Sequence, residues 1–155
     1  MEAMDAMDTI WLTGAQWLAV LRIGLGLWWL ESWRHKDKKT WFEGGGITWA
    51  ADIAAKHKWT AVRSGFDVVV APRPRTMAYV VAYAELALGL GLILGFLTPV
   101  ALVGGLLLNV LYFTLMIHDW AEQGQNSMMA LISVAALFGM SWQDWSVDGA
   151  LGLFQ

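Results

Sequence analysis

Four stretches of the chain consist almost entirely of apolar residues, and the segments between them carry most of the charges. The stretches cover approximately residues 14–33, 76–97, 99–117 and 126–143. A helix needs about 20 mostly apolar residues to cross a bilayer, and each stretch is close to that length. The pattern therefore predicts an all-α protein, a membrane bundle of four helices that forms a single domain over residues 1–155.

The connections after the second and third predicted helices are short. Gly95 suits the left-handed end of a helix, Thr98 suits a helix cap, and Pro99 suits a first helical turn, where no amide hydrogen is needed. This order predicts a tight hairpin. Residues 118–125 form another short connection, so helices two, three and four are expected to run antiparallel.

The first connection, residues 34–75, is long and contains most of the basic residues. After a glycine hinge at residues 44–46, Thr48 is expected to cap a short helix that lies on the bilayer surface. Its apolar side would contain Trp49, Ala50, Ile53, Ala54 and His57, and its polar side Asp52, Lys56 and Lys58. Residues 66–70 are expected to form either a short extended lid or a re-entrant stub.

Composition and charge indicate where the protein lies. Hydrophobic residues make up 57% of the chain and charged residues 15%, and there are 11 tryptophans, a residue that concentrates at membrane surfaces. Nine of the ten Lys and Arg residues lie in the first connection, with four acids. The positive-inside rule therefore predicts a multi-pass protein of the cell (inner) membrane, with the first loop cytoplasmic and both termini outside.

Several kinds of chemistry are excluded by residue content. The chain has no cysteine, which excludes disulfides, thiolate metal ligands, iron–sulfur clusters and cysteine nucleophiles. Its three histidines do not form a facing pair on the predicted helices, so we expect neither haem nor another metal site. We expect no covalently bound cofactor and no nucleic-acid partner.

Two ionisable residues lie deep in the predicted helices, Arg22 in the first and Glu85 in the second. A charged side chain at the centre of a bilayer costs about 2.5–3.5 kcal/mol on insertion scales, so each one needs a partner. Counted from the loop side, they lie at depths of roughly 16 and 14 Å at 1.5 Å per residue. We therefore expect them to pair, with Asn109 and Ser133 in the same layer.

Two interpretations of the expected pair stay open. It is either an internal ion pair that fixes the helix register, or one wall of a pocket that opens toward the loop side. Small residues at helical spacing accompany these polar residues, which indicates that they face the bundle and not lipid. A carbonyl or hydroxyl head group would bind in such a pocket. The candidate cofactor-binding residues are Arg22, Glu85, Asn109, Tyr83 and Tyr112.

The sequence resembles the DoxX/DoxD family of four-helix membrane proteins, which includes the small DoxD subunit of archaeal thiosulfate:quinone oxidoreductase. The segments that carry the resemblance are LRIGLGL at 21–27, AELALGLGLILGFLTP at 84–99, WAEQGQN at 120–126 and WSVD at 145–148. The resemblance implies a membrane subunit of an oxidoreductase or electron-transfer complex that associates with a quinone. Any enzymatic role would be that of a non-autonomous subunit, because electrons would have to come from a partner.

The alternative is a non-catalytic accessory subunit that stabilises a larger respiratory or photosynthetic membrane complex. Its tryptophan-rich faces and the small-residue pair Gly91 and Gly95 would pack against other subunits. Both hypotheses expect the lipid bilayer and further subunits as partners. A small-solute transporter ranks last, because the predicted helices lack the interruptions and the repeat symmetry common in transporters.

Overall fold

The computed structural model describes residues 12–154, and all regular elements in this range are helical. The predicted all-α class is therefore confirmed for the described residues. Residues 1–11, which include the N-terminus expected outside the membrane, and Gln155 lie outside the described range. The elements are α2 (Gly14–His35), α3 (Lys38–Phe42), α4 (Gly45–Ala55), α5 (Thr60–Gly65), η1 (Phe66–Val70), α6 (Pro74–Leu94), α7 (Thr98–Leu115), α8 (Trp120–Phe138) and α9 (Val147–Ala150).

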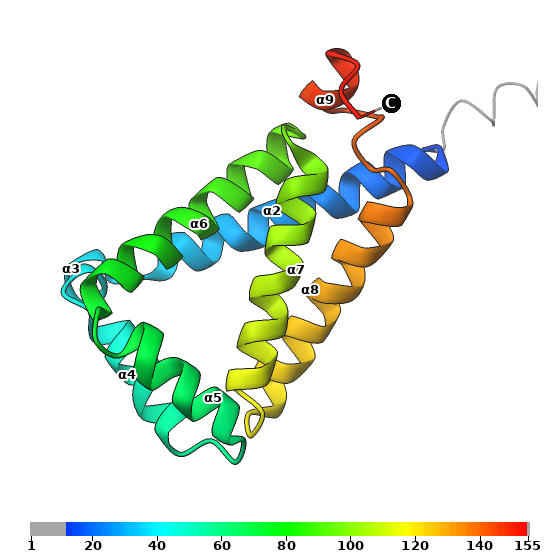
Figure 1. The fold of residues 1–155 in the computed structure, drawn as a ribbon. Coiled ribbons are helices and arrows are strands. Elements are labelled where there is room, and N and C mark those ends of the chain that lie inside the picture. Colours follow the sequence, from blue (N-terminus) through cyan, green and yellow to red (C-terminus); the bar gives the residue numbers. More distant parts are fainter. Residues whose placement is uncertain (1–11, 155) are drawn as a thin grey trace, which may run out of the picture.

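The four long helices form two pairs that diverge from one end. Helix α2 packs along α6, and α7 packs along α8. Figure 1 shows the pairs meeting near the α6–α7 turn and separating toward the other end, where α4 and α5 bridge them. The four long helices, with α4 and α5, therefore have the outline of a triangular frame, and α6, α7 and α8 run antiparallel in sequence, as predicted.

The long helices occur where the apolar stretches lie, with one clear shift in their bounds. Helix α8 runs from Trp120 to Phe138, whereas 126–143 was expected. The carboxylate of Asp119 accepts hydrogen bonds from the amides of Ala121 and Glu122 and so caps the helix. Hydropathy alone misplaced this start, because Glu122, Gln123 and Gln125 make residues 120–125 too polar for an apolar stretch although the segment is helical.

The α6–α7 hairpin has the predicted glycine and proline but a different cap. Gly95 adopts the left-handed conformation with φ of 65°, and Pro99 lies in the first turn of α7. The cap is not Thr98. The carboxylate of Asp148 in α9 accepts hydrogen bonds from the amides of Leu97 and Thr98, at 2.8 and 2.7 Å. The C-terminal segment therefore closes the hairpin end of the protein.

The contact between α2 and α6 is close because both helices present glycine to each other. A Cβ atom added at Gly26 would lie 2.9 Å from the carbonyl oxygen of Gly89, and one added at Gly89 would lie 2.9 Å from the amide nitrogen of Leu30. Small residues allow membrane helices to approach in this way. This contact sets the register of the two helices.

The first connection is helical throughout most of its length. Helix α4 begins at Gly45, three residues before the predicted cap, because Gly44 reverses the chain with φ of 99°. The predicted sides of this helix are largely present: Ala54 and His57 are buried, whereas Asp52, Lys56 and Lys58 are exposed, but Trp49 is 56% exposed.

Residues 66–70 form one π-helical turn that continues α5, so they are not an extended lid. The segment contains three consecutive valines, residues 68–70, which favour strands, but it does not pair as a strand within the described residues. A helical turn satisfies its backbone instead, and the amide of Ala71 donates to the carbonyl of Phe66 at 2.8 Å.

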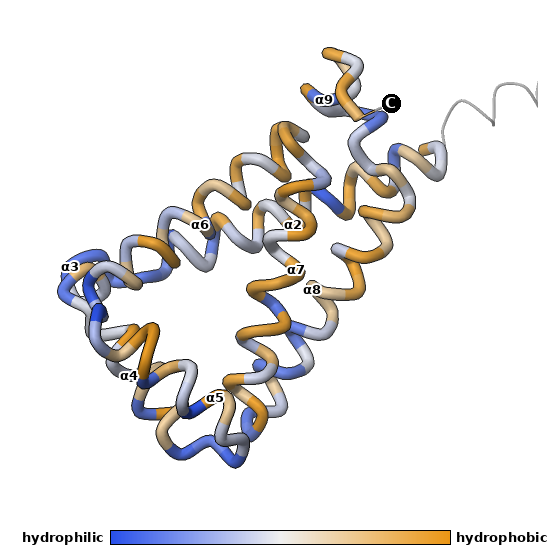
Figure 2. Tube along the Cα trace, viewed as in Figure 1, coloured by the Kyte–Doolittle hydropathy of each residue, from blue (hydrophilic) through white to orange (hydrophobic). Residues whose placement is uncertain are grey.

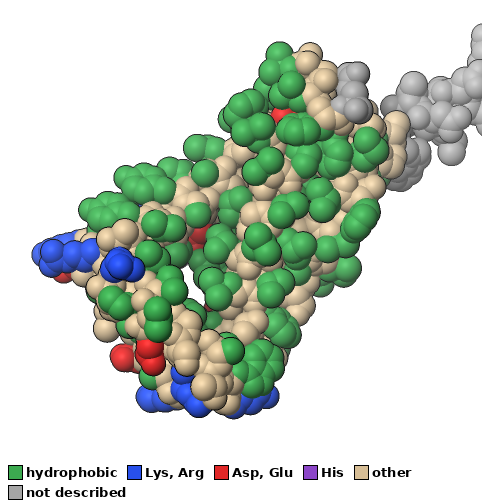
Figure 3. All heavy atoms as spheres, viewed as in Figure 1, with side chains coloured by type: hydrophobic (Ala, Val, Ile, Leu, Met, Phe, Trp, Pro, Cys, Tyr) green, Lys and Arg blue, Asp and Glu red, His purple; other side chains and the backbone are tan. Residues whose placement is uncertain are grey.

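The outer surface of the long helices is apolar. Within the described part of the chain, two helices, α6 and α7, are long and apolar enough to cross a membrane, and 28% of the most apolar window of each is buried. Figure 2 shows hydrophobic colour along most of α6 and α7, and hydrophilic colour around α3 and in the turn between α4 and α5. Figure 3 shows the Lys and Arg side chains gathered at that same end.

Candidate binding cavity

A cavity of about 460 Å³ lies inside the frame, between the two helix pairs and α4. The space-filling view shows the corresponding hollow in the middle of the molecule (Figure 3). Apolar side chains make up most of its wall. Its aromatic lining consists of Trp28, Trp29, Trp41, Trp49, Phe66 and Tyr112, and its polar lining of Ser32, Lys36, Glu85, Asn109, Glu122, Gln125 and Asn126.

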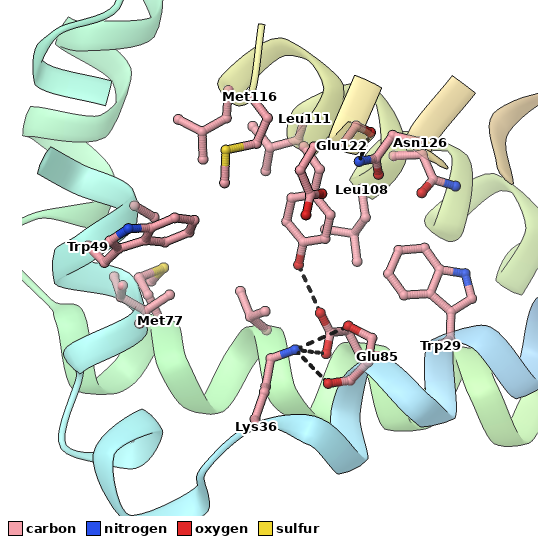
Figure 4. Close-up of a pocket in the computed structure, with 18 of the residues that line it drawn as sticks. Trp29, Lys36, Trp49, Met77, Glu85, Leu108, Leu111, Met116, Glu122 and Asn126 are labelled. Atoms are coloured by element: carbon pink, nitrogen blue, oxygen red, sulfur yellow. Dashed lines mark hydrogen bonds and ion pairs between the residues drawn. The ribbon is translucent and has the colours of Figure 1, made fainter. Parts of the chain in front are cut away.

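Glu85 forms the polar centre of this wall. Its side chain is 1% exposed and forms an ion pair with Lys36, whose side chain is 11% exposed. The second carboxylate oxygen, Oε1, accepts a hydrogen bond of 3.1 Å from the hydroxyl of Tyr112. Figure 4 shows Lys36 approaching the carboxylate of Glu85 from the end of α2, and Tyr112 belongs to α7. Three elements therefore contribute one connected polar cluster.

Lys36 is held in place by neighbouring groups. Its ammonium donates to the carbonyl and the hydroxyl oxygen of Ser32, at 3.1 and 3.3 Å, and lies 4.6 Å from the centre of the Trp41 ring. The cation–π contact and the hydrogen bonds replace the water that the ammonium loses on burial. Two residues further on, the pKa of the Lys38 ammonium is lowered by burial and by the positive charge of Lys36.

Asn109 lines the same cavity from α7 and is completely buried. Neither the oxygen nor the nitrogen of its amide has a hydrogen-bond partner within residues 12–154. Leaving a buried polar group unpaired costs about 1–3 kcal/mol, so two such atoms on one side chain call for an explanation. A ligand with a polar head group in the cavity would supply the missing partner.

Helices α4 and α5 lie at the loop end, where α4 and the η1 turn that follows α5 line the cavity. His57, between these helices, is 2% exposed, and its Nε2 atom lies 2.9 Å from the carbonyl oxygen of Thr114 in α7. The amide of Trp59 donates to Nδ1 of the same ring at 3.1 Å, so Nε2 carries the hydrogen and donates it to Thr114. This bond fixes the bridging segment to α7.

The prediction that Arg22 and Glu85 form a pair is wrong. Among the described residues, the ion-pair partner of Glu85 is Lys36. Arg22 is fully buried, but its guanidinium donates to the carbonyl oxygens of Ser141, Asp144 and Trp145, at 2.7, 3.3 and 2.6 Å. It therefore binds the C-terminal segment at the hairpin end. Arg22 is absent from the cavity lining of the described chain.

The glycine contact explains why the two charges lie apart. Arg22 is four residues before Gly26, and Glu85 is four residues before Gly89. Because the helices are antiparallel and the two glycines face each other, these steps lead in opposite directions and separate the charges by about 12 Å along the axis. Side chains also tilt toward the N-terminus of their own helix, which adds to the separation. The depth count assumed that both helices end level at the loop side, but α6 extends further.

The remaining predicted site residues divide between the cavity and the surface. Tyr112 lines the cavity, whereas Tyr83 is 57% exposed on the outer side of α6, where its ring stacks near Phe42 and Tyr79. Ser133 is buried, but its hydroxyl donates to the carbonyl of Met129 in its own helix at 2.8 Å. Of the five predicted site residues, the structure thus brings Glu85, Asn109 and Tyr112 together.

Lys36 is the residue that the sequence analysis missed. It belongs to a basic cluster directly after the first predicted helix, Arg34, Lys36, Lys38 and Lys39, and was interpreted only as part of the positive charge that places the first loop in the cytoplasm. The sequence does contain a signal for its position. Arg22, Trp29 and Lys36 follow one another at intervals of seven residues, which places them on the same helix face. Trp29 on that face is 1% exposed and packs in the core.

Comparison with known protein families, with curated proteins and with solved structures finds no match to this chain. The cavity is therefore interpreted from its own geometry. Among the described residues no three His, Asp or Glu side chains are placed to hold a metal ion. The cavity has a few hydrogen-bonding groups beside aromatic rings, the combination by which ligand pockets commonly fix the orientation of a small molecule.

Proposed function

We propose that the chain is a four-helix membrane protein whose cavity binds a quinone-class ring, and that it acts as a DoxX-like, non-autonomous subunit of an oxidoreductase or electron-transfer complex. One observation carries the proposal: an aromatic cavity of about 460 Å³ with the unpartnered amide of Asn109 in its wall. Ligand sites are typically about 300–1,000 Å³ and mostly apolar, with a few fixed polar groups. A ring with oxygen substituents and an apolar tail meets these conditions.

The exposed surfaces of all four long helices support a membrane location. Large apolar side chains that are more than half exposed occur on α2, α6, α7 and α8, for example Leu27, Leu94, Leu107 and Phe138. In water such faces would be an aggregation hazard, whereas lipid covers them at no cost. Helices α2 and α8 are less apolar than α6 and α7, because they carry Arg22 and the polar start of α8.

The resemblance to DoxX/DoxD proteins supports the quinone class and the role as a subunit. The chain has no cysteine and no facing histidine pair, so electrons would reach the bound ring from another subunit. Within this arrangement the residues of the chain would bind the ring, orient it and exclude water from it. The quinone would supply the redox chemistry.

The accessory-subunit alternative loses one supporting feature. Gly91 and Gly95 were expected to be available for a neighbouring protein, but both face inward. A Cβ atom at Gly91 would lie 3.3 Å from the carbonyl oxygen of Phe96, and one at Gly95 would lie 2.3 Å from the Cβ of Ser146. This pair of glycines packs against the chain itself, and we therefore favour the cavity-based function.

The test is to purify the protein gently into lipid nanodiscs, extract it with organic solvent and quantify the quinone that accompanies each chain. Asn109→Leu removes both unpartnered atoms with little change in volume, so the variant should fold at least as well as the wild type. We expect its quinone content to fall about fivefold or more, since each lost hydrogen bond costs about 0.5–1.5 kcal/mol.

The matched controls are two tyrosine variants. Tyr83→Phe alters an exposed hydroxyl outside the cavity and should leave the total content of quinone and hydroquinone unchanged, whereas Tyr112→Phe alters the hydroxyl beside Glu85 and should reduce that total. Equal quinone content in the wild type and Asn109→Leu would exclude the cavity as the binding site. A wild-type protein that carries no quinone from quinone-replete membranes would exclude the proposed ligand class.

A further inference from the structure

The polar hydrogen atoms of Lys36 and Tyr112 in the cavity are already committed. Lys36 has three N–H groups, and the structure gives them three acceptors: the carbonyl of Ser32, the hydroxyl of Ser32 and Oε2 of Glu85. Tyr112 has one hydroxyl hydrogen, which it donates to Oε1 of Glu85. Neither residue has a hydrogen left to donate to a ligand.

The lone pairs of the same cluster are largely free. Each oxygen of Glu85 accepts one hydrogen bond, although a carboxylate oxygen accepts about two. The phenolic oxygen of Tyr112 donates its hydrogen and retains its acceptor capacity. Glu122, which also lines the cavity and is labelled in Figure 4, adds a further carboxylate. Glu85, Tyr112 and Glu122 therefore offer a ligand acceptor oxygens and no free hydrogen.

We propose that the cavity selects the hydroxyl-bearing, reduced form of its ring, a hydroquinone, over the corresponding quinone. The inference rests on the proposed function and names the redox state that the site prefers. A hydroquinone hydroxyl has a hydrogen to donate to Glu85 or Tyr112. A quinone carbonyl at the same position would place an oxygen lone pair against acceptor oxygens, and the negative charge of the carboxylate repels it.

The other polar groups do not reverse this preference. The amide of Asn109 has both an unpartnered N–H and an unpartnered oxygen. The amides of Gln125 and Asn126 and the hydroxyl of Ser32, which also line the cavity, are likewise donors and acceptors, so these groups serve a hydroxyl and a carbonyl alike. The indole nitrogen of Trp29 is a donor, but Figure 4 shows it on the side of the ring away from Glu85, and Gly105 of α7 lies next to it. Selection between the two redox forms therefore depends on Glu85 and Tyr112.

The experiment compares three small ligands that share one ring: trimethylhydroquinone, trimethylbenzoquinone and the dimethyl ether of trimethylhydroquinone. Binding is measured by anaerobic titration calorimetry with the full chain in phosphatidylcholine nanodiscs, and empty nanodiscs correct for partition into lipid. We expect the hydroquinone to bind roughly tenfold tighter than the other two, because hydrogen bonds to charged groups contribute about 1.5–3 kcal/mol. The dimethyl ether isolates the O–H group, since it keeps the reduced ring but cannot donate.

Two variants assign the preference to the polar cluster. Lys36→Met combined with Glu85→Gln removes the charged acceptor without leaving an unpaired charge, and its affinities for hydroquinone and quinone should agree within about twofold. Tyr83→Phe should retain the wild-type ratio. Circular dichroism of both variants shows that they are folded before their affinities are compared.

The possible results distinguish a failure of the redox selection from a failure of the proposed ring-binding function. If the quinone binds as tightly as the hydroquinone, or tighter, the selection is wrong while the cavity still binds such rings. If the variant with both Lys36→Met and Glu85→Gln still prefers hydroquinone, the inference is also wrong, because the carboxylate of Glu85 is then not the cause of the selection. If none of the three ligands binds, the proposed function fails, and the selection fails with it.

Discussion

Lys36 and Glu85 form a buried ion pair although they are 49 residues apart in the sequence. The pair joins the end of α2 to the middle of α6 at the wall of the cavity. Burial of both charges removes water from them, so each depends on the other and on the hydrogen bonds from Ser32 and Tyr112. The pair therefore contributes to the geometry of the site and to the stability of the fold.

The first prediction concerns this pair. Lys36→Met should destabilise the protein by about 3–5 kcal/mol, because it leaves the carboxylate of Glu85 buried without its cation. Adding Glu85→Gln should restore much of the loss, since no charge then remains unpaired. The measurement is denaturant-induced unfolding in detergent micelles, followed by circular dichroism.

Lys39→Met is the matched control for the lysine change. Lys39 belongs to the same basic cluster but is exposed, so its replacement should alter the free energy of unfolding by no more than about 0.5 kcal/mol. An equal, small effect of Lys36→Met and Lys39→Met would show that the Lys36–Glu85 pair does not stabilise the protein.

The second prediction concerns the contact of α2 with α6. Gly89→Ala should cost about 1–3 kcal/mol, because its Cβ would meet the backbone of Leu30 and Gly26 at 2.9 and 3.1 Å and would push the helices apart. Gly24→Ala is the control in the partner helix, because its Cβ would meet nothing within 4 Å, and it should be neutral or stabilising. Equal melting temperatures of the two variants would contradict the observed register.

The number of long helices, the position of the hairpin and the close approach of small residues could be predicted from the sequence. Each of these features depends on a local pattern. The helices follow from apolar stretches of helical length, the hairpin from the order of Gly95 and Pro99, and the close approach from the spacing of the glycines. The partners of Arg22 and Glu85 could not be predicted in this way, because they depend on the relative axial position of two helices. That position is set by the contact of Gly26 with Gly89, and helix lengths counted from hydropathy do not contain it.

The C-terminal segment illustrates a second limit of the sequence. Arg22 binds three backbone carbonyls of residues 141–145, and any residue type supplies a carbonyl, so no side-chain pattern indicates this contact. Asp148 caps α7 across 50 residues of chain, whereas the local candidate, Thr98, was the natural expectation for a cap. Hydrogen bonds to backbone groups from side chains far away in the sequence therefore cannot be predicted from a local sequence pattern.

The third prediction follows from the position of Arg22. Arg22→Leu should release the segment after α8 and make the peptide bonds of residues 140–146 more sensitive to limited proteolysis, because their carbonyls lose a buried donor. Binding of a quinone-class ring should be unchanged, since Arg22 does not line the cavity. A variant that keeps its C-terminal segment protected but loses the ligand would restore Arg22 as a binding residue.

The last prediction tests the proposed orientation in the membrane. The chain has no cysteine, so single cysteines can be introduced without a background. Lys58→Cys lies in the basic first connection and Phe96→Cys in the α6–α7 turn, and both positions are exposed. With the basic loop inside, as the positive-inside rule requires, a membrane-impermeant thiol reagent should label the Phe96 variant in intact spheroplasts and the Lys58 variant only after lysis. The reverse pattern would invert the orientation, and labelling of both before lysis would show that α6 does not cross the membrane.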